Sequence, residues 1–428
     1  MYLYQRPRSS HYGAEIGSSV GAYIPTYEGL GQGGKEPLLE YLAFEGGGGK
    51  GVTYLGAVRA LESHLILPID IARRGQNQIK GISGASAGAI SALLLAMGLN
   101  ADQLSEILNR PEDFTAFFDD PEPGYSRSID INGQPAKHYT KPSPATLVTT
   151  FTDFQWRILF SNLESWLGKS NPLVKQLSKH SATYIHNLRI EGGLFPGFAM
   201  RKFLAEVITT HLTKKVGRPV SGATLGFREF HELTGVDLRV TGTNKTSGKS
   251  MMFSRWCTPW LPVAEAVGIS ASLPLIFKPV HVKRLRNFKY NGDGWDGGLL
   301  NNLPLHAFDL DGRESCKEPP QTVPPLHPKM LALRLTDGPC KATATEAALK
   351  LLAGPGLSDA LKELLKSVFG LSESGQIRTK QDRNQTIELR TYCLSTVDFG
   401  PSEAVKAAPI AEAEKQVNEY LVRLKNRR

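Results

Sequence analysis

The fold is decided by residues 79–97, which read IKGISGASAGAISALLLAM. The first five residues predict a short buried strand, GASAG is a Gly-x-Ser-x-Gly turn, and the remainder predicts a buried helix. The chain before it has the same order: residues 38–44 predict a strand, residues 46–51 (GGGGKG) a turn, and residues 50–65 a helix. Two successive strand–helix units predict a parallel sheet with helices on its faces.

The rest of the chain extends this α/β pattern. Further strands are expected at Val236–Thr241, Met251–Phe253, Met330–Leu335 and Thr386–Tyr392. We expect a loosely ordered arm at 1–36, a main domain at 37–340 with a helical cap inserted at about 100–213, and a C-terminal part at 341–428. In that last part, a helical segment, a strand and a closing helix should pack on the main domain.

Composition excludes several classes of protein. With 428 residues, 41% hydrophobic and 21% charged, the chain is neither disordered nor collagen-like. No apolar stretch approaches the roughly 20 residues of a membrane span, and no apolar region suggests a secretory signal. The cysteines are too few and too far apart for a disulfide scaffold or a zinc site, which favours a reducing compartment. They are Cys257, Cys316, Cys340 and Cys393.

Ser86 is the first candidate for chemistry. It lies between Gly84 and Gly88 at the predicted turn from strand to helix, where a serine hydroxyl would be presented at the carboxyl end of the sheet. The glycines would allow the backbone and a substrate to approach closely. This pattern indicates a nucleophile; the alternative is a glycine-rich turn with an incidental serine.

The second candidate is the glycine run. It consists of Gly46, Gly47, Gly48, Gly49, Lys50 and Gly51. Its backbone N–H groups could bind an anion at a helix start. A phosphate-binding P-loop is disfavoured because Gly51, and not Ser or Thr, follows Lys50. An oxyanion hole serving Ser86 explains both turns together; for Lys50, a solvent-facing lysine is the alternative.

A third motif makes a family resemblance specific. Residues 291–304 read NGDGWDGGLLNNLP, and they follow Gly-Gly-Gly-x-Lys-Gly and Gly-x-Ser-x-Gly in order. Supporting segments are 194–197 (LFPG), 224–227 (TLGF), 240–244 (VTGTN) and 270–277 (SASLPLIF). Over about residues 38–335 the chain resembles the patatin-like phospholipases. That resemblance implies a three-layer α/β/α fold with a mostly parallel central sheet.

The resemblance also implies the chemistry. Ser86 would be the nucleophile and Asp296 the base, and Gly297 and Gly298 would form the turn after the base. The amides of Gly47 and Gly48 in the glycine run would hold the oxyanion, with the Lys50 region beside them. The implied activity is A-type phospholipase hydrolysis of fatty-acyl esters through an acyl-enzyme, with neither a cofactor nor a metal. A carboxylate in a poorly hydrated site can accept the serine proton and later activate water.

Alternatives stay open at this point. Asp293 is a rival base, although Trp295 follows its glycine and we expect it at the rim. A Ser-His-Asp triad would need His306 or His327, neither of which lies in a convincing motif. An acyltransferase would use the same acyl-enzyme, and a non-catalytic lipid-binding module would use only the fold.

Charge bears on the partners, and the resemblance implies the substrate and an activator. The net charge of +9 favours anionic lipid surfaces or nucleic acid, and no basic-aromatic module supports nucleic acid. We expect a membrane phospholipid substrate, peripheral attachment from the cytoplasm or export without a cleavable signal, and an activating protein or small ligand. The basic segment 281–289 and the amphipathic segment 357–369 are candidate lipid contacts, though each is better explained by ordinary solvated or core-facing packing.

Overall fold

The structure is a computed structural model. It describes residues 38–108, 117–119, 125–129, 135–139, 192–282, 290–310, 325–337, 377–392 and 401–426, with isolated residues at 175, 183, 184, 187, 312, 316 and 394. The predicted segment 357–369 and most of the basic segment 281–289 lie outside these residues. None of the described helices combines the length and hydropathy needed to cross a bilayer.

The described strands form one large sheet and one small one. They are β1 (Tyr41–Phe44), β2 (Gly81–Gly84), β3 (Tyr125–Ile129), β4 (Pro135–Tyr139), β5 (Gly193–Phe195), β6 (Asp237–Asn244), β7 (Lys249–Phe253), β8 (Leu275–Phe277), β9 (Val280–Val282), β10 (Gly292–Asp296), β11 (Met330–Thr336) and β12 (Thr386–Arg390). The large sheet has the order β12-β11-β1-β2-β6-β10-β9-β3-β4, with β7 also paired to β6, and β5 pairs with β8.

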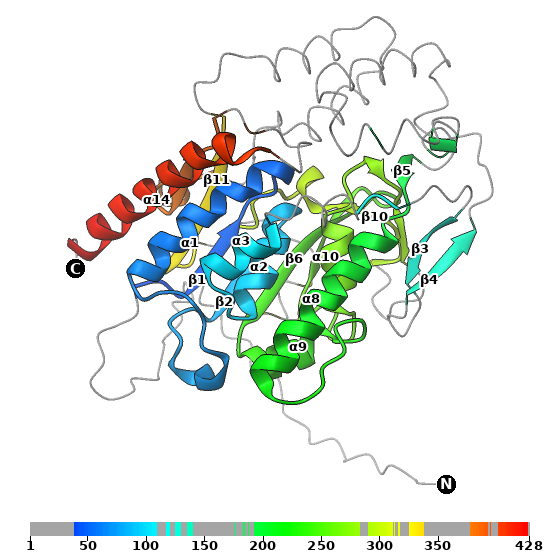
Figure 1. Ribbon diagram of the computed structural model, residues 1–428, viewed down its shortest axis with the longest axis horizontal. Helices are drawn as coiled ribbons and strands as arrows, with labels where there is room; N and C mark the ends of the chain where they lie inside the picture. Colours follow the sequence, from blue (N-terminus) through cyan, green and yellow to red (C-terminus); the bar gives the residue numbers. More distant parts are fainter. Residues whose placement is uncertain are drawn as a thin grey trace, which may run out of the picture. The chain divides into compact units, whose positions relative to one another are not determined.

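The helical elements cover this sheet (Figure 1). The α-helices are α1 (Tyr54–Ser63), α2 (Ala87–Ala96), α3 (Ala101–Leu108), α8 (Phe198–Val216), α9 (Phe227–Thr234), α10 (Val263–Ser270), α13 (Lys380–Asn384) and α14 (Glu403–Asn426). The 3-10 helices are η1 (Gly48–Thr53), η2 (Ile71–Gln76) and η4 (Gly297–Leu299). The expected mixed α/β fold with a mostly parallel central sheet flanked by helices is therefore confirmed.

The centre of the sheet is parallel, as the two strand–helix units predict. Strands β12, β11, β1, β2 and β6 run parallel to one another, whereas β10 and β7 are antiparallel to β6. All carboxyl ends of the parallel strands therefore lie along one edge. The turn after β2, which holds Ser86, and the turn after β1, which holds the glycine run, lie side by side on this edge because β1 and β2 are paired from Tyr41 to Phe44.

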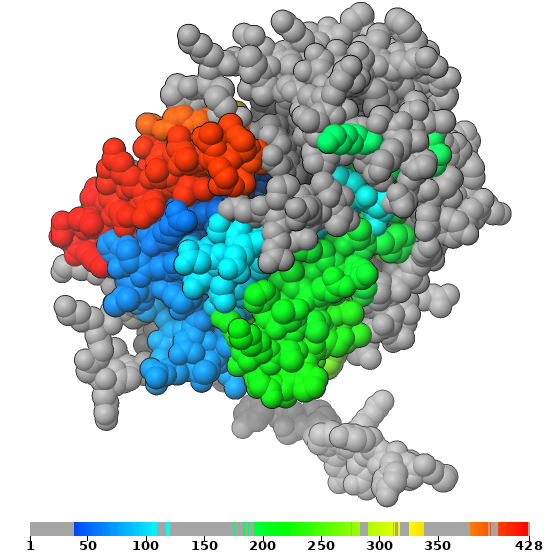
Figure 2. Space-filling view, in the orientation of Figure 1, coloured from blue at the N-terminus to red at the C-terminus, as the bar shows by residue number. Residues whose placement is uncertain are grey.

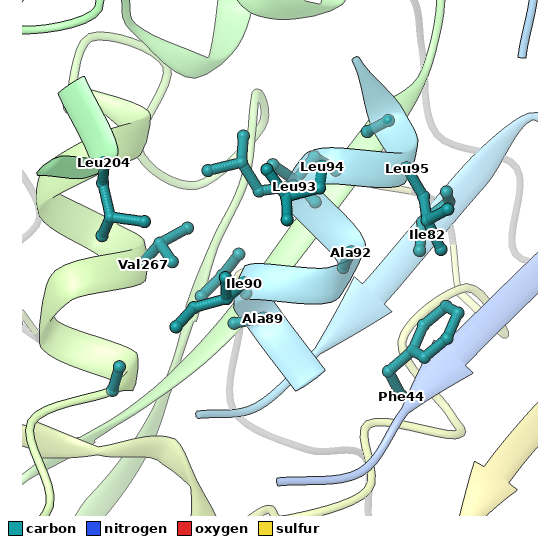
Figure 3. Packing of buried hydrophobic residues seen from close by; sticks show 14 of the residues in the cluster. Phe44, Ile82, Ala89, Ile90, Ala92, Leu93, Leu94, Leu95, Leu204 and Val267 are labelled. Atoms are coloured by element: carbon teal, nitrogen blue, oxygen red, sulfur yellow. The ribbon is translucent and has the colours of Figure 1, made fainter. Parts of the chain in front are cut away.

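Successive side chains of a strand point to opposite faces of the sheet, and this alternation divides the core into two clusters. In β1, Leu42 and Phe44 pack into the main cluster, while Ala43 faces a smaller cluster formed with Leu303, Phe308 and neighbouring residues on the opposite side. The main cluster is centred on α2, which is buried nearly all round. Figure 3 shows α2 with Phe44 and Ile82 of the strands on one side and Leu204 and Val267 on the other.

Helix α14 packs on the same face of the large sheet as α1 and α2. It lies beside α1, followed across the surface by α2 and α8 (Figure 2). Its buried residues fall on one face at helical spacing and are Lys406, Pro409, Ala413, Val417 and Leu421. The two helices approach so closely that a Cβ atom on Gly56 of α1 would overlap the carbonyl oxygen of Ile410. Gly56 therefore fixes the position of α14 against the main domain.

Two features differ from the sequence-based expectations. The cap expected to be helical contains β3 and β4, which pair antiparallel and extend the large sheet through β9. Asn132-Gly133 lies between these strands in the sequence and is a hairpin signal that our expectation of a helical cap did not use. The second difference is a disulfide between Cys257 and Cys316, whose Cα atoms lie 5.1 Å apart. Their separation of 59 residues gives no local signal for pairing.

Candidate active site

Ser86 occupies a tight turn between β2 and α2. Its backbone has φ 51° and ψ −125°, in the positive-φ region that residues other than glycine rarely adopt. A Cβ atom on Gly84 would overlap the backbone of Gly88, and one on Gly88 would overlap the carbonyl oxygens of Phe44 and Glu45. Both glycines are therefore required by close backbone packing, and the turn holds the Ser86 side chain at the carboxyl edge of the sheet.

Asp296 ends β10 beside this turn. It is 2% exposed, and its Oδ1 accepts a hydrogen bond of 2.6 Å from the N–H of Gly298. The Ser86 hydroxyl faces this carboxylate closely enough to lower its pKa, although Oδ2 has no hydrogen bond of regular geometry among the described residues. Catalytic hydrogen bonds are often long until a substrate is in place. The structure thus brings together the two residues that the resemblance implied.

Burial controls the charge of Asp296. Loss of hydration raises the pKa of its carboxyl from 3.8 to about 7, against the opposing effects of the Ser86 hydroxyl and the Gly298 N–H group. A carboxyl with a pKa near 7 is suited to accepting and returning a proton at neutral pH. No histidine or second carboxylate is needed to explain this shift.

The glycine run packs against the Ser86 turn. A Cβ atom on Gly46 would lie 2.9 Å from the Cβ of Ser86. Gly48 has φ +53°, which favours glycine at the start of η1. In the described part of the chain, the N–H groups of Gly48 and Gly49 donate no backbone hydrogen bond outside η1, and the first groups of a helical turn have no acceptor within it. These two N–H groups are available to an anion next to Ser86.

Lys50 does not face solvent, so the alternative of a solvent-facing lysine at this position is wrong. Its side chain is 9% exposed, and Nζ forms an ion pair of 2.6 Å with Asp337 after β11. Glu45 is buried nearby and accepts a hydrogen bond of 2.6 Å from the N–H of Leu335. Burial raises the pKa of Glu45 to about 7, against the opposing effects of this N–H group and of Arg334. Both side chains tie the glycine run to β11.

Sequence reasoning missed three residues that tie the site together. The Ser270 hydroxyl at the end of α10 accepts a hydrogen bond of 2.9 Å from the Ser86 N–H, and the carbonyl of Ser272 accepts one of 3.0 Å from the Asp296 N–H. Asn302 donates from its side chain to the carbonyl of Gly46, at 3.1 Å, and accepts from the Gly46 N–H. The available signal was their place in the motifs at 270–277 and 291–304.

An apolar pocket opens at Ser86. It has about 770 Å³ of empty space, part of which is open solvent. Its lining includes Gly48, Gly49 and Gly51 together with mostly apolar side chains. These side chains are Val52, Ala87, Ile90, Leu108, Phe117, Phe118, Met200, Ala271, Leu273 and Phe277. Such a wall suits a hydrocarbon chain whose polar end reaches Ser86.

The alternative candidates for the catalytic base have other partners than Ser86. Asp293 is partly exposed and pairs with His281 at 2.5 Å. His306 pairs with Asp309 at 2.6 Å, and the ring of His327 packs edge-on against Tyr41 at 4.5 Å. Tyr41 begins β1, whereas Ser86 follows the end of β2, so the histidine ring lies at the opposite edge of the sheet. The structure places none of these residues with Ser86.

The chain is similar in sequence to known proteins. The chain is 32% identical over 142 residues to "Probable lipid hydrolase 463L" of Invertebrate iridescent virus 6, covering 33% of this chain and 42% of that protein. It is 20% identical over 274 residues to "Uncharacterized protein YqhO" of Bacillus subtilis (strain 168), covering 63% and 66%. The matches thus span less than two thirds of either relative.

Solved structures are also similar. VipD from Legionella pneumophila is 18% identical with a TM-score of 0.46, covering 90% of this chain and 67% of that one. ExoU, in complex with SpcU from the type III secretion system of Pseudomonas aeruginosa, is 17% identical with a TM-score of 0.36, covering 91% and 53%. The family profile described as "Patatin-like phospholipase" matches residues 42–309, more than half of the chain. The chain belongs to the patatin-like phospholipase family.

Proposed function

We propose that the protein is a phospholipase of the A type, which hydrolyses fatty-acyl esters of membrane phospholipids with Ser86 as nucleophile and Asp296 as base. The observation that carries the proposal is the pairing of a strained serine turn with a buried carboxyl whose pKa is raised to about 7, beside an apolar pocket. Family membership supports lipid hydrolysis, and the pocket supports an acyl chain as the group bound next to Ser86.

The first half of the reaction forms an acyl-enzyme. The Ser86 oxygen attacks the ester carbonyl carbon while its proton passes to Asp296. The negative charge that develops on the carbonyl oxygen is stabilised by the N–H groups of Gly48 and Gly49. When the tetrahedral intermediate collapses, the bond to the alcohol oxygen breaks, and the departing lysophospholipid takes the proton from Asp296.

The second half releases the fatty acid. Water gives a proton to Asp296 and attacks the acyl carbon, and the same N–H groups stabilise the second oxyanion. Collapse breaks the bond to Ser86, which recovers the proton from Asp296. The residues return to their starting state, so the cycle needs no further proton donor.

The test is fatty-acid release from vesicles of phosphatidylglycerol and phosphatidylcholine, with and without cell extract as a source of an activating protein or ligand. Wild type is compared with Ser86→Ala, Asp296→Asn and the double variant His306→Gln/His327→Gln. We expect the first two to lose release and the histidine variant to retain it. Dependence on the histidines would contradict the dyad. Release that never depends on Ser86 would favour the binding module, and acyl transfer to added lysolipid would show an acyltransferase.

A further inference from the structure

The apolar pocket has one charged side chain among the described residues that line it. This residue is Lys406, in the first turn of α14, far along the chain from Ser86. Its side chain is only 5% exposed. A buried ammonium group must have a negatively charged partner, because an uncompensated charge is costly to remove from water. What partners Lys406 therefore indicates what this part of the pocket can bind.

One partner in the structure is the carboxylate of Glu403. It lies 2.9 Å from the Lys406 Nζ atom, one turn earlier in the same helix, and its side chain is 78% exposed. An exposed carboxylate returns readily to water, and such pairs contribute about 0–1 kcal/mol. A second anion that enters the pocket can therefore replace Glu403 at little cost. Lys406 would then have a negatively charged partner before and after the exchange.

The position of Lys406 is fixed by packing. Helix α14 is held against α1 by the close approach at Gly56 and by its buried face, which includes Ala413 and Val417. This packing holds the stem of Lys406 in the pocket lining, to which Pro401 also belongs. A residue on a packed helix that lines the same pocket as the nucleophile is well placed to set substrate preference.

We propose that Lys406 binds the phosphate group of the phospholipid substrate and so selects phospholipids over neutral acyl esters. This inference rests on the proposed function. In a glycerophospholipid the phosphate lies only a few bonds from the acyl esters, so one molecule can place an ester at Ser86, a chain in the pocket and its phosphate at Lys406. A single cation among the described, mostly apolar lining residues matches a ligand with one anionic group. Helix α14 would thereby supply a specificity residue.

The kinetic test compares Lys406→Met, which keeps the length of the side chain, with Lys406→Arg and Glu403→Gln. Each is assayed on phosphatidylcholine and on diacylglycerol with the same acyl chains in detergent micelles. We expect Lys406→Met to lower the ratio of kcat/KM for phosphatidylcholine to that for diacylglycerol about tenfold, Lys406→Arg to restore most of it, and Glu403→Gln to leave or increase it. An unchanged ratio in Lys406→Met would overturn the proposal.

A binding test separates this inference from the proposed function. In the Ser86→Ala background, we would titrate an ether-linked lysophospholipid and the matching alkyl glycerol, with and without Lys406→Met. The proposal predicts that Lys406→Met weakens the phospholipid analogue about tenfold more than the alkyl glycerol. Equal weakening would overturn it, whether or not hydrolysis occurs. Titrations with inorganic phosphate and with oleate identify the source of the anion: a Lys406-dependent preference for oleate would assign the residue to the fatty-acid product and reject the proposal.

Discussion

The two edges of the parallel sheet use buried polar residues in opposite ways. At the amino edge, Asp309 accepts hydrogen bonds both from the His306 ring and from the N–H of His327, and Asp382 caps α13 while lying 3.5 Å from His306. At the carboxyl edge, Ser86 has a strained backbone and Oδ2 of Asp296 has no regular hydrogen bond among the described residues. Satisfied networks stabilise a fold, whereas strain and incomplete pairing occur where chemistry is done.

This contrast explains why His306 and His327 are poor candidates for a catalytic base, although the imidazole group is chemically suited to that role. Burial lowers the pKa of His327, but its backbone and ring nitrogen are engaged by Asp309 and Lys329 in joining strand ends. Burial raises the pKa of Asp296 instead, and leaves it facing a serine hydroxyl. Burial thus shifts the pKa of a residue that joins strand ends at the amino edge, and of a residue that faces the Ser86 hydroxyl at the carboxyl edge.

The largest effect is expected at Asp296. Asp296→Asn removes the proton acceptor but keeps the shape of the side chain, so kcat should fall by about a thousandfold or more. Asp293→Asn is the matched control, since Asp293 pairs with His281 at the rim, and kcat should change less than about threefold. Initial rates of fatty-acid release measure both. A larger loss in the Asp293 variant would make that residue the base.

The glycine run should show the next largest effect. In Gly46→Ala, the new methyl group would crowd the Asn302 side chain and the Cβ of Ser86, which displaces the N–H groups that face the pocket. We expect kcat to fall about a hundredfold, as when an oxyanion donor is lost. Gly75→Ala is the control, because no atom lies within 4 Å of its Cβ position. Similar losses in both variants would argue against a role for the run in transition-state stabilisation.

A smaller loss is expected from Ser270→Ala. This change removes the acceptor for the Ser86 N–H, so the turn loses one restraint, and kcat should fall about tenfold with little change in KM. Ser63→Ala on the surface of α1 is the control. The rate of Ser86 labelling by a fluorophosphonate distinguishes positioning from general destabilisation, since it should fall in parallel with kcat while the folded fraction stays constant. An unchanged labelling rate would contradict the positioning role.

The pH dependence should follow Asp296. Because its pKa is raised to about 7 and its carboxylate is the active form, kcat/KM should fall below pH 7, by about tenfold at pH 6. The raised pKa also favours the protonated folded state, so the free energy of unfolding should decrease as the pH rises from about 4 to 7. Glu45 has a similar pKa, and Glu45→Gln should therefore flatten the stability profile but leave the activity midpoint in place. A midpoint that moves with Glu45→Gln would assign the activity profile to Glu45.

The smallest effect on activity is expected at the amino edge. His306→Gln breaks the contact with Asp309 and should lower the free energy of unfolding by about 1–2 kcal/mol. The rate of fatty-acid release by the folded enzyme should stay within about twofold of wild type. Urea unfolding and initial rates at saturating substrate separate the two quantities. A large loss of rate without a loss of stability would overturn the contrast between the two edges.

Local patterns account for the part of the structure that was predicted. The strand, turn and helix around Ser86 follow from spacing within a single run of sequence, and β6, β7, β11 and β12 lie close to where alternation predicted them. Asp296 came from resemblance and not from spacing. Contacts between segments that are distant in the sequence could not be predicted, because no local pattern marks them. One is the hydrogen bond between Ser270 and Ser86, which are separated by 184 residues. The others are the Cys257–Cys316 disulfide and the position of Lys406 in the pocket lining.

The central claim is that Ser86 is a nucleophile activated by Asp296 alone. The most direct measurement is labelling with a long-chain alkyl fluorophosphonate, followed by intact mass and peptide mapping, in wild type, Asp296→Asn and His306→Gln/His327→Gln. The account predicts one adduct on Ser86, formed at a similar rate in the histidine variant and at least a hundredfold more slowly in Asp296→Asn. An adduct on another residue, or labelling that is lost with the histidines, would contradict it.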